Sequence, residues 1–246
     1  MADSEGRVRH MDPLGRPYER AFATFLAHTD QKDRALARLT DIVAGLPNRR
    51  VLVDAGAGTG LTTGALAARF GRTIAIEPSP HLPEALQREH PQVTVLPELI
   101  LDADPGAEAD LVLCSHVLYY IPQERWPEHV TRMTSWLAPG GEAVIILQNP
   151  GSDCMRMLHH FTGRLPDLRP LVGIRPGWPS WIETVPSMIA ANDLDTATTI
   201  AEFILNLGPL TPPPPLSDLR AYLRDSTGGT YRLTCTQDFL RIRRPA

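Results

Sequence analysis

The chain has 246 residues, with 24 Lys and Arg against 28 Asp and Glu and a formal net charge of -4. This length suits one α/β domain with an elaboration, and 43% hydrophobic with 21% charged residues allow a sizeable core. The slightly acidic balance argues against a protein that binds nucleic acid or anionic membranes. Of the 24 basic residues, 23 are arginine, which we interpret as high-GC codon usage of an actinobacterial kind.

The N-terminal segment, the apolar runs and the cysteines indicate which kind of protein this is. The first ten residues, MADSEGRVRH, include acidic residues and no apolar stretch, which predicts that no secretory signal is present. No apolar run approaches the ~18 residues of a membrane span. The three cysteines, Cys114, Cys154 and Cys235, form no CxxC pair, so neither a disulfide framework nor a zinc ribbon is indicated. We therefore expect a cytoplasmic protein that binds neither nucleic acid nor membranes.

The first 150 residues read as helices alternating with strands. Apolar residues at three- and four-residue spacings predict helix over 18–46. Further on, strands are expected at 51–53, 73–76, 93–96, 110–114 and 143–147, and helices at 62–70, 83–90 and 125–137. Such alternation implies βαβ units, so we predict an α/β fold with a Rossmann-like, doubly wound, mostly parallel sheet.

The regular alternation of predicted strands and helices ends after residue 150. The pattern there predicts a loop or lid over 163–180, a helix over 181–191, a strand or mixed segment over 195–205, a helix over 217–224 with Ser217 as N-cap, and two strands over 230–243. The proline run at 212–215 favours a rigid connector over a recognition ligand. We expect one domain over 1–246, with a helical cap at 18–46, a cofactor-binding core at 50–150 and a part at 151–246 that completes the sheet and covers the substrate.

The most informative segment joins the first predicted strand to the next helix. It reads Val51-Leu-Val-Asp-Ala-Gly-Ala-Gly-Thr-Gly-Leu61. Glycines let the main chain approach a ligand where a Cβ atom would clash. A dinucleotide fingerprint requires G-x-G-x-x-G, whereas this loop reads G-x-G-x-G and has Leu61 in place of the third glycine. Asp54, two residues before the first glycine, would also repel a pyrophosphate.

This loop resembles motif I of class I methyltransferases that use S-adenosyl-L-methionine (SAM), written D/E-x-G-x-G-x-G. SAM carries a sulfonium and an ammonium, which suit Asp54. Glu77 at the end of the second strand, where a carboxylate can accept both ribose hydroxyls, and the turn Leu137-Ala-Pro-Gly-Gly141 extend the resemblance. It implies SAM as cofactor, S-adenosyl-L-homocysteine (SAH) as product and no metal. The cofactor-binding residues it implies are Asp54, Gly56, Gly58, Gly60, Glu77, Pro78, Glu98 and Ser115.

Two of these assignments carry a specific role. Glu98, just past the third strand, is expected at the adenine amine, although Leu99 or Asp102 could hold that position instead. Asp54 is expected to order the loop and the ammonium end of the cofactor. These assignments follow from the resemblance alone.

Four further segments resemble histamine N-methyltransferase and its relatives. They are Tyr18–His28, Ile76–Ser79, Val117–Ile121 and Pro213–Leu223. The resemblance implies an enzyme for a small-molecule acceptor, over which the N-terminal aromatics and the C-terminal part close. The family has Gln where this chain has His116. An imidazole there could take a proton from the acceptor, since its unperturbed pKa lies near neutrality, or it could simply pack.

On the acceptor side we expect Tyr18, Phe22, Gln31, Tyr119, Trp178 and Arg175. A wall that attracts a cation could be formed by Tyr18, Phe22, Tyr119 and Tyr120, although the spacing of Tyr18 and Phe22 also suits a core face. Trp178 lies in the predicted lid, where it could cover the acceptor or anchor the loop. By the resemblance, Gln31 and Cys235 replace an acidic residue and an Asn that contact the amine, which argues against histamine itself. Four arginines could instead hold a carboxylate or phosphonate, or lie in solvent: Arg156, Arg164, Arg169 and Arg175.

We therefore expect a SAM-dependent methyltransferase (EC 2.1.1), monomeric or homodimeric, acting on N or O of a small polar metabolite. High-GC ancestry suggests natural-product metabolism. A metal site at Cys154, His159 and His160 is not favoured, because adjacent histidines point apart on a helix and no carboxylate stands at ligand spacing. The alternatives are O-methylation of an acid held by Arg, an NAD-dependent oxidoreductase, and a SAM-binding protein without catalysis.

Overall fold

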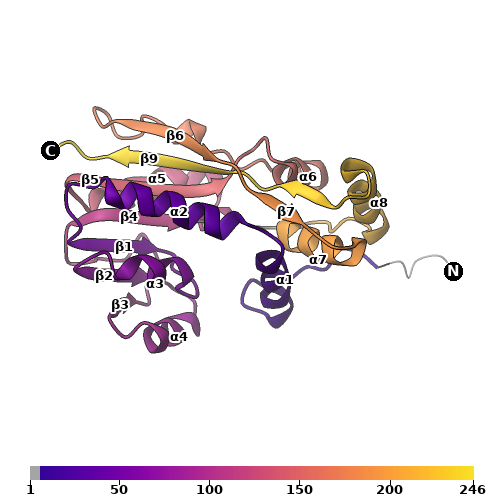
Figure 1. Cartoon of the computed structure of the whole chain (residues 1–246), viewed down its shortest axis with the longest axis horizontal. Coiled ribbons are helices and arrows are strands. Elements are labelled where there is room, and N and C mark those ends of the chain that lie inside the picture. The colour runs from indigo at the N-terminus through magenta and orange to yellow at the C-terminus, as the bar shows by residue number, and fades with distance from the viewer. Residues whose placement is uncertain (1–5) are drawn as a thin grey trace. The chain divides into compact units, whose positions relative to one another are not determined.

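The computed structural model describes residues 6–246 and contains a seven-stranded sheet (Figure 1). The strand order is β3-β2-β1-β4-β5-β9-β6, and the first five strands in this order pair in parallel. Their bounds are β1 Val51–Ala55, β2 Arg72–Ile76, β3 Val93–Leu96, β4 Ala109–Ser115, β5 Leu137–Gln148, β6 Ser180–Val185 and β9 Gln237–Arg243. The first five of the ten N-terminal residues used for the signal-peptide prediction lie outside the described residues.

Helices flank the parallel part of the sheet. These are α2 (Gln31–Ala44), α3 (Leu61–Ala67), α4 (Leu82–Glu89) and α5 (Trp126–Ser135). Leu86 of α4 and Ala67 of α3 are buried together with Ala75 of β2 and Val93 of β3. The Rossmann-like, mostly parallel sheet predicted from the alternating pattern is therefore confirmed. No helix within residues 6–246 has both the length and the apolar character needed to cross a membrane.

The described chain folds into two compact units. The first, which we call the sheet unit, comprises residues 35–147, 167–184 and 238–246. The second, the helical unit, comprises residues 6–34, 148–166 and 185–237. Its elements are α1 (Arg16–Ala27), α6 (Asp153–Thr162), α7 (Leu194–Leu205), α8 (Leu216–Thr227) and the antiparallel pair β7 (Met188–Ala190) and β8 (Arg232–Thr234).

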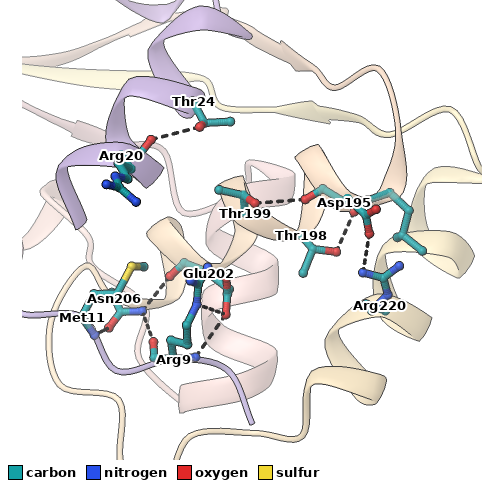
Figure 2. A network of polar contacts seen from close by, with 11 residues as sticks. Arg9, Met11, Arg20, Thr24, Asp195, Thr198, Thr199, Glu202, Asn206 and Arg220 are labelled. Carbon is teal, nitrogen blue, oxygen red and sulfur yellow. Dashed lines mark hydrogen bonds and ion pairs between the residues drawn. The ribbon is translucent and has the colours of Figure 1, made fainter. Parts of the chain in front are cut away.

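Within the helical unit, buried Glu202 of α7 fixes the segment that precedes α1 (Figure 2). Its carboxylate accepts hydrogen bonds from the main-chain N–H of Arg9 at 3.1 Å and from the Arg9 guanidinium at 2.6 Å. One turn later, Asn206 accepts from the N–H of Met11 at 2.8 Å and donates to the carbonyl of Arg9 at 2.9 Å. These bonds provide partners for main-chain groups of Arg9 and Met11, which lie outside any strand.

The predicted helix over 18–46 is two helices, α1 and α2. They are separated at residues 28–30, where Thr29 forms a β-bridge with Ile189. The carboxylate of Asp30 also accepts the N–H of Met188 at 2.8 Å. The interruption arises because this short segment pairs with β7, a long-range contact that helical periodicity does not report.

Two predictions beyond residue 180 are wrong. The segment 181–191 is not a helix but contains β6 and β7, since Pro186 interrupts it and Thr184 and Val185 are β-branched. The segment 195–205 is not a strand but α7. Asp193 is its N-cap and accepts the N–H of Thr196 at 2.7 Å. Because α7 is buried over most of its surface, its sequence lacks the polar face that marks a helix.

The other C-terminal predictions need smaller corrections. The predicted helix over 217–224 is α8, but its N-cap is Pro215 and not Ser217. The two strands expected over 230–243 are β8 and β9, which lie in different sheets. The proline run lies beside residues 6–8, where the N–H of Val8 donates to Pro214 O at 2.9 Å. Only its carbonyls can take part in such pairing, because proline has no N–H.

A buried carboxylate at the start of β4 makes the stability of the sheet unit pH-dependent. Asp110 accepts hydrogen bonds from the N–H groups of Arg50 and Val51 at 2.6 and 3.1 Å and pairs with the Arg50 guanidinium at 2.8 Å. Burial alone would raise the pKa of Asp110, but these bonds outweigh burial and hold it below its usual value. The charged form therefore stabilises the fold above the unfolded pKa, about 3.9, and this contribution is lost as the pH falls through the folded pKa.

We expect Asp110→Asn to cost about 1–3 kcal/mol at pH 7, because the neutral amide loses the charge that pairs with Arg50 and places an NH2 donor against a donor in either orientation. The difference in unfolding free energy from wild type should shrink once the pH drops below about 4. Urea denaturation between pH 7 and pH 3 measures both effects. A difference that stays constant over this range would contradict the assignment. Asp102→Asn, at an exposed position, is the control.

Candidate functional site

The predicted cofactor residues lie at one edge of the sheet. β1, β2 and β4 are parallel neighbours, and their register places Ala55 beside Ile76 and Asp54 beside Leu113. Their carboxyl ends therefore meet, and the glycine loop, Glu77 and Ser115 follow them directly. The order of connections reverses between β1 and β4. Open α/β sheets bind ligands outside the carboxyl ends of the strands at such a reversal.

The glycine loop adopts a main-chain conformation that requires glycine at three positions. Gly56, Gly58 and Gly60 have φ of 86°, 57° and 81°, in the left-handed region where other residues are strained. The N–H groups of Gly56 and Ala57 both donate to Ile76 O, at 2.8 and 3.2 Å. The start of the loop is thereby fixed to the end of β2.

Glu77 is buried, and one of its carboxylate oxygens bonds to the glycine loop while the other bonds to Ser79, just after β2. Oε2 accepts the N–H of Gly58 at 2.8 Å, and Oε1 accepts the N–H and hydroxyl of Ser79 at 3.0 and 2.5 Å. An ionised carboxylate offers about four lone-pair directions, so these three bonds leave it able to accept a ligand hydroxyl. The sequence identified Glu77, but it did not assign Ser79 the role of its partner.

Asp54 lies at the base of the loop, in β1. It is 2% exposed, and its Oδ2 accepts the hydroxyl of Thr63, one turn into α3, at 2.6 Å. Burial, and next the charge of Asp54, raise the pKa of Cys114 in β4, so this thiol stays protonated. Asp54 thus joins β1 to α3 across the loop. The partner Thr63 was missed, although a hydroxyl in the helix after the loop could have suggested it.

His116 follows β4 and has an unusual main chain. Its φ is 61°, in the left-handed region that few residues other than glycine adopt. The N–H of His116 donates to Ile146 O of β5 at 2.8 Å, and its ring stacks on buried Tyr119 with centroids 5.9 Å apart. A strained conformation held by surrounding bonds is typical of functional sites.

The remaining residues predicted at the cofactor are accessible. Pro78 and Glu98 are exposed where they follow β2 and β3. Leu99 is 60% exposed, and Asp102 is exposed as well. The geometry of the edge therefore does not distinguish Glu98 from these alternatives for an adenine contact.

Tyr18 and Phe22 belong to an aromatic cluster within the helical unit. Their rings lie 5.2 and 5.3 Å from Phe203 of α7, which also packs on Phe25. Tyr18 is 8% exposed, whereas Phe22 is half-buried. This packing corresponds to the core-face alternative for the N-terminal aromatics.

Gln31 and Cys235 are neighbours within the same unit. The amide of buried Gln31 donates to the Cys235 carbonyl at 3.0 Å, and the hydroxyl of Ser187 donates to that carbonyl at 2.7 Å. Thr29 lies against the same cysteine, with Oγ1 to Sγ at 3.3 Å. The two positions singled out for an amine contact therefore lie in one buried polar cluster.

Arg175 and Trp178 lie away from the glycine loop within the sheet unit. The Arg175 guanidinium stacks over the Trp178 ring at 4.5 Å. Pro179 next to them accepts the N–H of Arg243 at 2.9 Å, and the following residue, Arg244, donates its N–H to Gly141 O of β5 at 2.9 Å. That part of β5 is at the amino-terminal edge of the parallel strands. The placement separates Arg175 and Trp178 from the cofactor residues, and we do not assign them to the acceptor.

The other arginines of the 151–180 stretch pair with acids or are partly buried. Arg169 bonds to Asp167 at 2.7 Å, and Arg156 bonds to Asp153. Burial lowers the pKa of Arg164. Among residues 6–246, no three His, Cys, Asp or Glu side chains come together as a metal site.

Comparison with known proteins assigns this architecture. A profile of the methyltransferase domain family matches residues 26–193, more than half of the chain. The biotin biosynthesis bifunctional protein BioHC of Cellvibrio japonicus (strain Ueda107) is 27% identical over 143 residues, which are 56% of this chain and 28% of that protein. The chain thus spans little more than a quarter of this curated relative.

Two solved structures share the fold. A candidate methyltransferase from Bacillus halodurans C-125 has a TM-score of 0.63 at 13% identity, covering 86% of this chain and 99% of its own. The N-methyltransferase NodS from Bradyrhizobium japonicum WM9, in complex with SAH, has a TM-score of 0.53 at 16% identity, covering 95% and 91%. At these identities the two structures establish the fold alone. The extent of the profile match establishes more: this chain belongs to the methyltransferase domain family.

Proposed function

We propose that the protein transfers a methyl group from SAM to a nitrogen or oxygen of a small polar metabolite. One observation carries the proposal: Glu77 bonds to the glycine loop at the carboxyl edge of the sheet, where the connections reverse. A dinucleotide site would need a third glycine at the position of Leu61 and would bring phosphates close to Asp54. Both features disfavour the NAD alternative.

The residues present fit SAM. A Cβ on Gly58 would meet no atom within 4 Å, so the loop is open at this glycine, and the adjacent Glu77 retains lone pairs for ribose hydroxyls. SAM, when bound, supplies a methyl group made electrophilic by its sulfonium. The Methyltransferase family match and the SAH complex of NodS support this cofactor.

His116 is proposed to accept the proton that the acceptor nucleophile loses. Its position directly after β4, beside Ser115 at the same edge as the glycine loop, supports this role. The bond from its N–H to Ile146 and the stacking on Tyr119 hold the imidazole in one orientation. Orientation of this kind accounts for much of the rate enhancement in reactions between bound groups.

The side chains favour an amine acceptor over an acid. An acid acceptor would require unpaired arginines, but Arg156 and Arg169 bond to neighbouring aspartates and Arg175 lies at the opposite sheet edge. The resemblance to histamine N-methyltransferase, together with Gln31 and Cys235 in place of the residues that contact the amine there, supports the finer proposal of an amine acceptor other than histamine. A monomer or homodimer acting in natural-product metabolism, in the cytoplasm, completes this proposal.

Calorimetric titration with SAH tests the cofactor directly. Wild type should bind SAH in the micromolar range, and Glu77→Gln should weaken binding by about tenfold or more, equivalent to about 1.4 kcal/mol. The reason is that the amide places a donor against the N–H of Gly58 or Ser79 and offers fewer acceptors to ribose.

Glu89→Gln, at an exposed position on α4, is the matched control and should leave the SAH affinity unchanged. Heat on titration with NAD, together with no heat from SAH, would overturn the proposal in favour of an oxidoreductase. SAH binding with no methyl transfer to any amine or acid in a broad panel would instead favour a SAM-binding protein without catalysis.

A further inference from the structure

Val117, the residue after His116, fills the space beside the first loop glycine. A Cβ atom on Gly56 would lie 2.3 Å from Cγ2 of Val117 and 3.1 Å from its Cγ1. On the main-chain side, the N–H of Gly56 donates to Ile76 O at 2.8 Å. Gly56 is therefore held between the end of β2 and the isopropyl group of Val117.

Val117 is itself held on both sides. Before it, the N–H of His116 donates to Ile146 O of β5 at 2.8 Å. After it, the indole N–H of Trp126 in α5 donates to the carbonyls of Leu118 and Ile121 at 2.9 and 3.0 Å. A short segment fixed at both ends cannot move away from Gly56 without breaking these bonds, so the contact transmits displacement instead of absorbing it.

The three loop glycines differ in what surrounds them. A Cβ on Gly58 would meet open space, and one on Gly60 would meet Leu86 and His90 at 3.0 Å or more. Gly56 is the one of the three that lies against the segment bearing His116. The contact between Gly56 and Val117 therefore joins the loop proposed to bind the cofactor to the residue proposed to accept the proton.

We propose that Val117 is a positioning residue that sets the separation between the glycine loop and His116. This inference rests on the proposed function, because the separation affects the reaction only if the loop binds SAM and His116 accepts the proton. A misplacement of about 1 Å between reacting groups can cost on the order of 100-fold in rate. A β-branched side chain is a suitable spacer, because the two methyl groups on its Cβ restrict rotation about χ1.

A double-mutant cycle tests the contact, with SAH as the probe. Gly56→Ala should weaken SAH binding by at least about tenfold, because the new methyl collides with Val117 and the residue is strained at φ of 86°. Val117→Ala removes both colliding carbons. The double variant should therefore bind SAH at least about threefold more tightly than Gly56→Ala alone.

Gly106→Ala is the control for backbone strain. Gly106 has φ of 61°, and its added Cβ would meet no atom within 4 Å. The loss of stability of this variant in urea gives the cost of the left-handed conformation alone. Adding Val117→Ala should not relieve that cost, whereas it should relieve part of the larger loss expected for Gly56→Ala.

A spectroscopic measurement separates positioning from mere packing. In wild type, saturation with SAH should shift the NMR signal of the His116 ring, because loop displacement reaches it through Val117. Val117→Ala should reduce this shift by about half or more at full saturation, and the isosteric Val117→Thr should restore it. This NMR measurement does not use Gly56→Ala, so it tests the proposal even if that variant does not fold.

The outcomes distinguish the two proposals. If wild type fails to bind SAH, the proposed function itself fails. If wild type binds SAH but Val117→Ala neither relieves Gly56→Ala nor changes the His116 shift, the positioning role is overturned and the proposed function stands. Unchanged SAH affinity in Gly56→Ala would also overturn it, since the contact would then not constrain the loop.

Discussion

His116→Asn should slow methyl transfer by about 10²–10⁴-fold while changing the affinity for SAH by no more than about threefold. The asparagine amide cannot accept the proton that His116 is proposed to take from the acceptor, so we expect the chemical step to slow. Asparagine tolerates the left-handed main chain better than most residues, so the φ of 61° at this position can be kept. The loss should therefore fall on turnover and not on cofactor binding.

Transfer of a labelled methyl group from SAM to a panel of amines and carboxylic acids measures this effect. His116→Gly, which also relieves the backbone strain, should be as slow as His116→Asn. His81→Asn, at an exposed position before α4, should remain as active as wild type. A rate close to wild type for His116→Asn would reduce the histidine to a packing partner of Tyr119.

The second large effect concerns Glu142 in β5. Its side chain is fully buried, and it bonds to Arg241 and, at 2.8 Å, to Arg243, both in β9. We expect Glu142→Ala to lower the free energy of unfolding by about 3–5 kcal/mol, because Arg241 loses its main partner while it stays buried. Denaturation by urea, followed by circular dichroism, gives this value.

Glu128→Ala provides the matched comparison. Glu128 pairs with Arg125 at 3.1 Å, but both side chains are more than half exposed, so its removal should cost less than about 1 kcal/mol. Combining Glu142→Met with Arg241→Met should recover much of the loss, since an apolar pair carries no desolvation penalty. Equal losses for Glu142→Ala and Glu128→Ala would contradict the importance of the buried pair.

The parallel strands and their order of appearance were predictable because buried strands are short apolar runs separated by helices. The runs at 73–76 and 93–96 match β2 and β3 to within one residue. The secondary-structure predictions were wrong where tertiary contacts decide local structure. Residues 195–205 are rich in Thr and Ile, which favour a strand, yet burial on most sides and the cap at Asp193 make them a helix.

For the candidate site, the sequence indicated which residues follow the strands but not which side chains contact one another. Asp54, the three loop glycines and Glu77 lie at one edge, since parallel strands bring their carboxyl ends together, and their role in binding SAM stays a prediction. The partners Thr63, Ser79 and Val117 were not assigned, because a pattern reports residue types and not which side chains meet. Arg175 and Trp178 were expected at the acceptor only because they lie in an irregular segment. The pairing that puts them at the other edge involves β9, about 60 residues further along the chain.

The position of β9 between β5 and β6 has a consequence for biosynthesis. About 50 residues separate the end of β6 from the start of β9, so β6 leaves the ribosome well before its sheet neighbour exists. At typical elongation rates this interval lasts roughly 3–10 s, during which the strand edges of β5 and β6 are unpaired. Such edges recruit other chains. We therefore expect newly made protein to depend on chaperones more than the stability of the finished sheet would suggest.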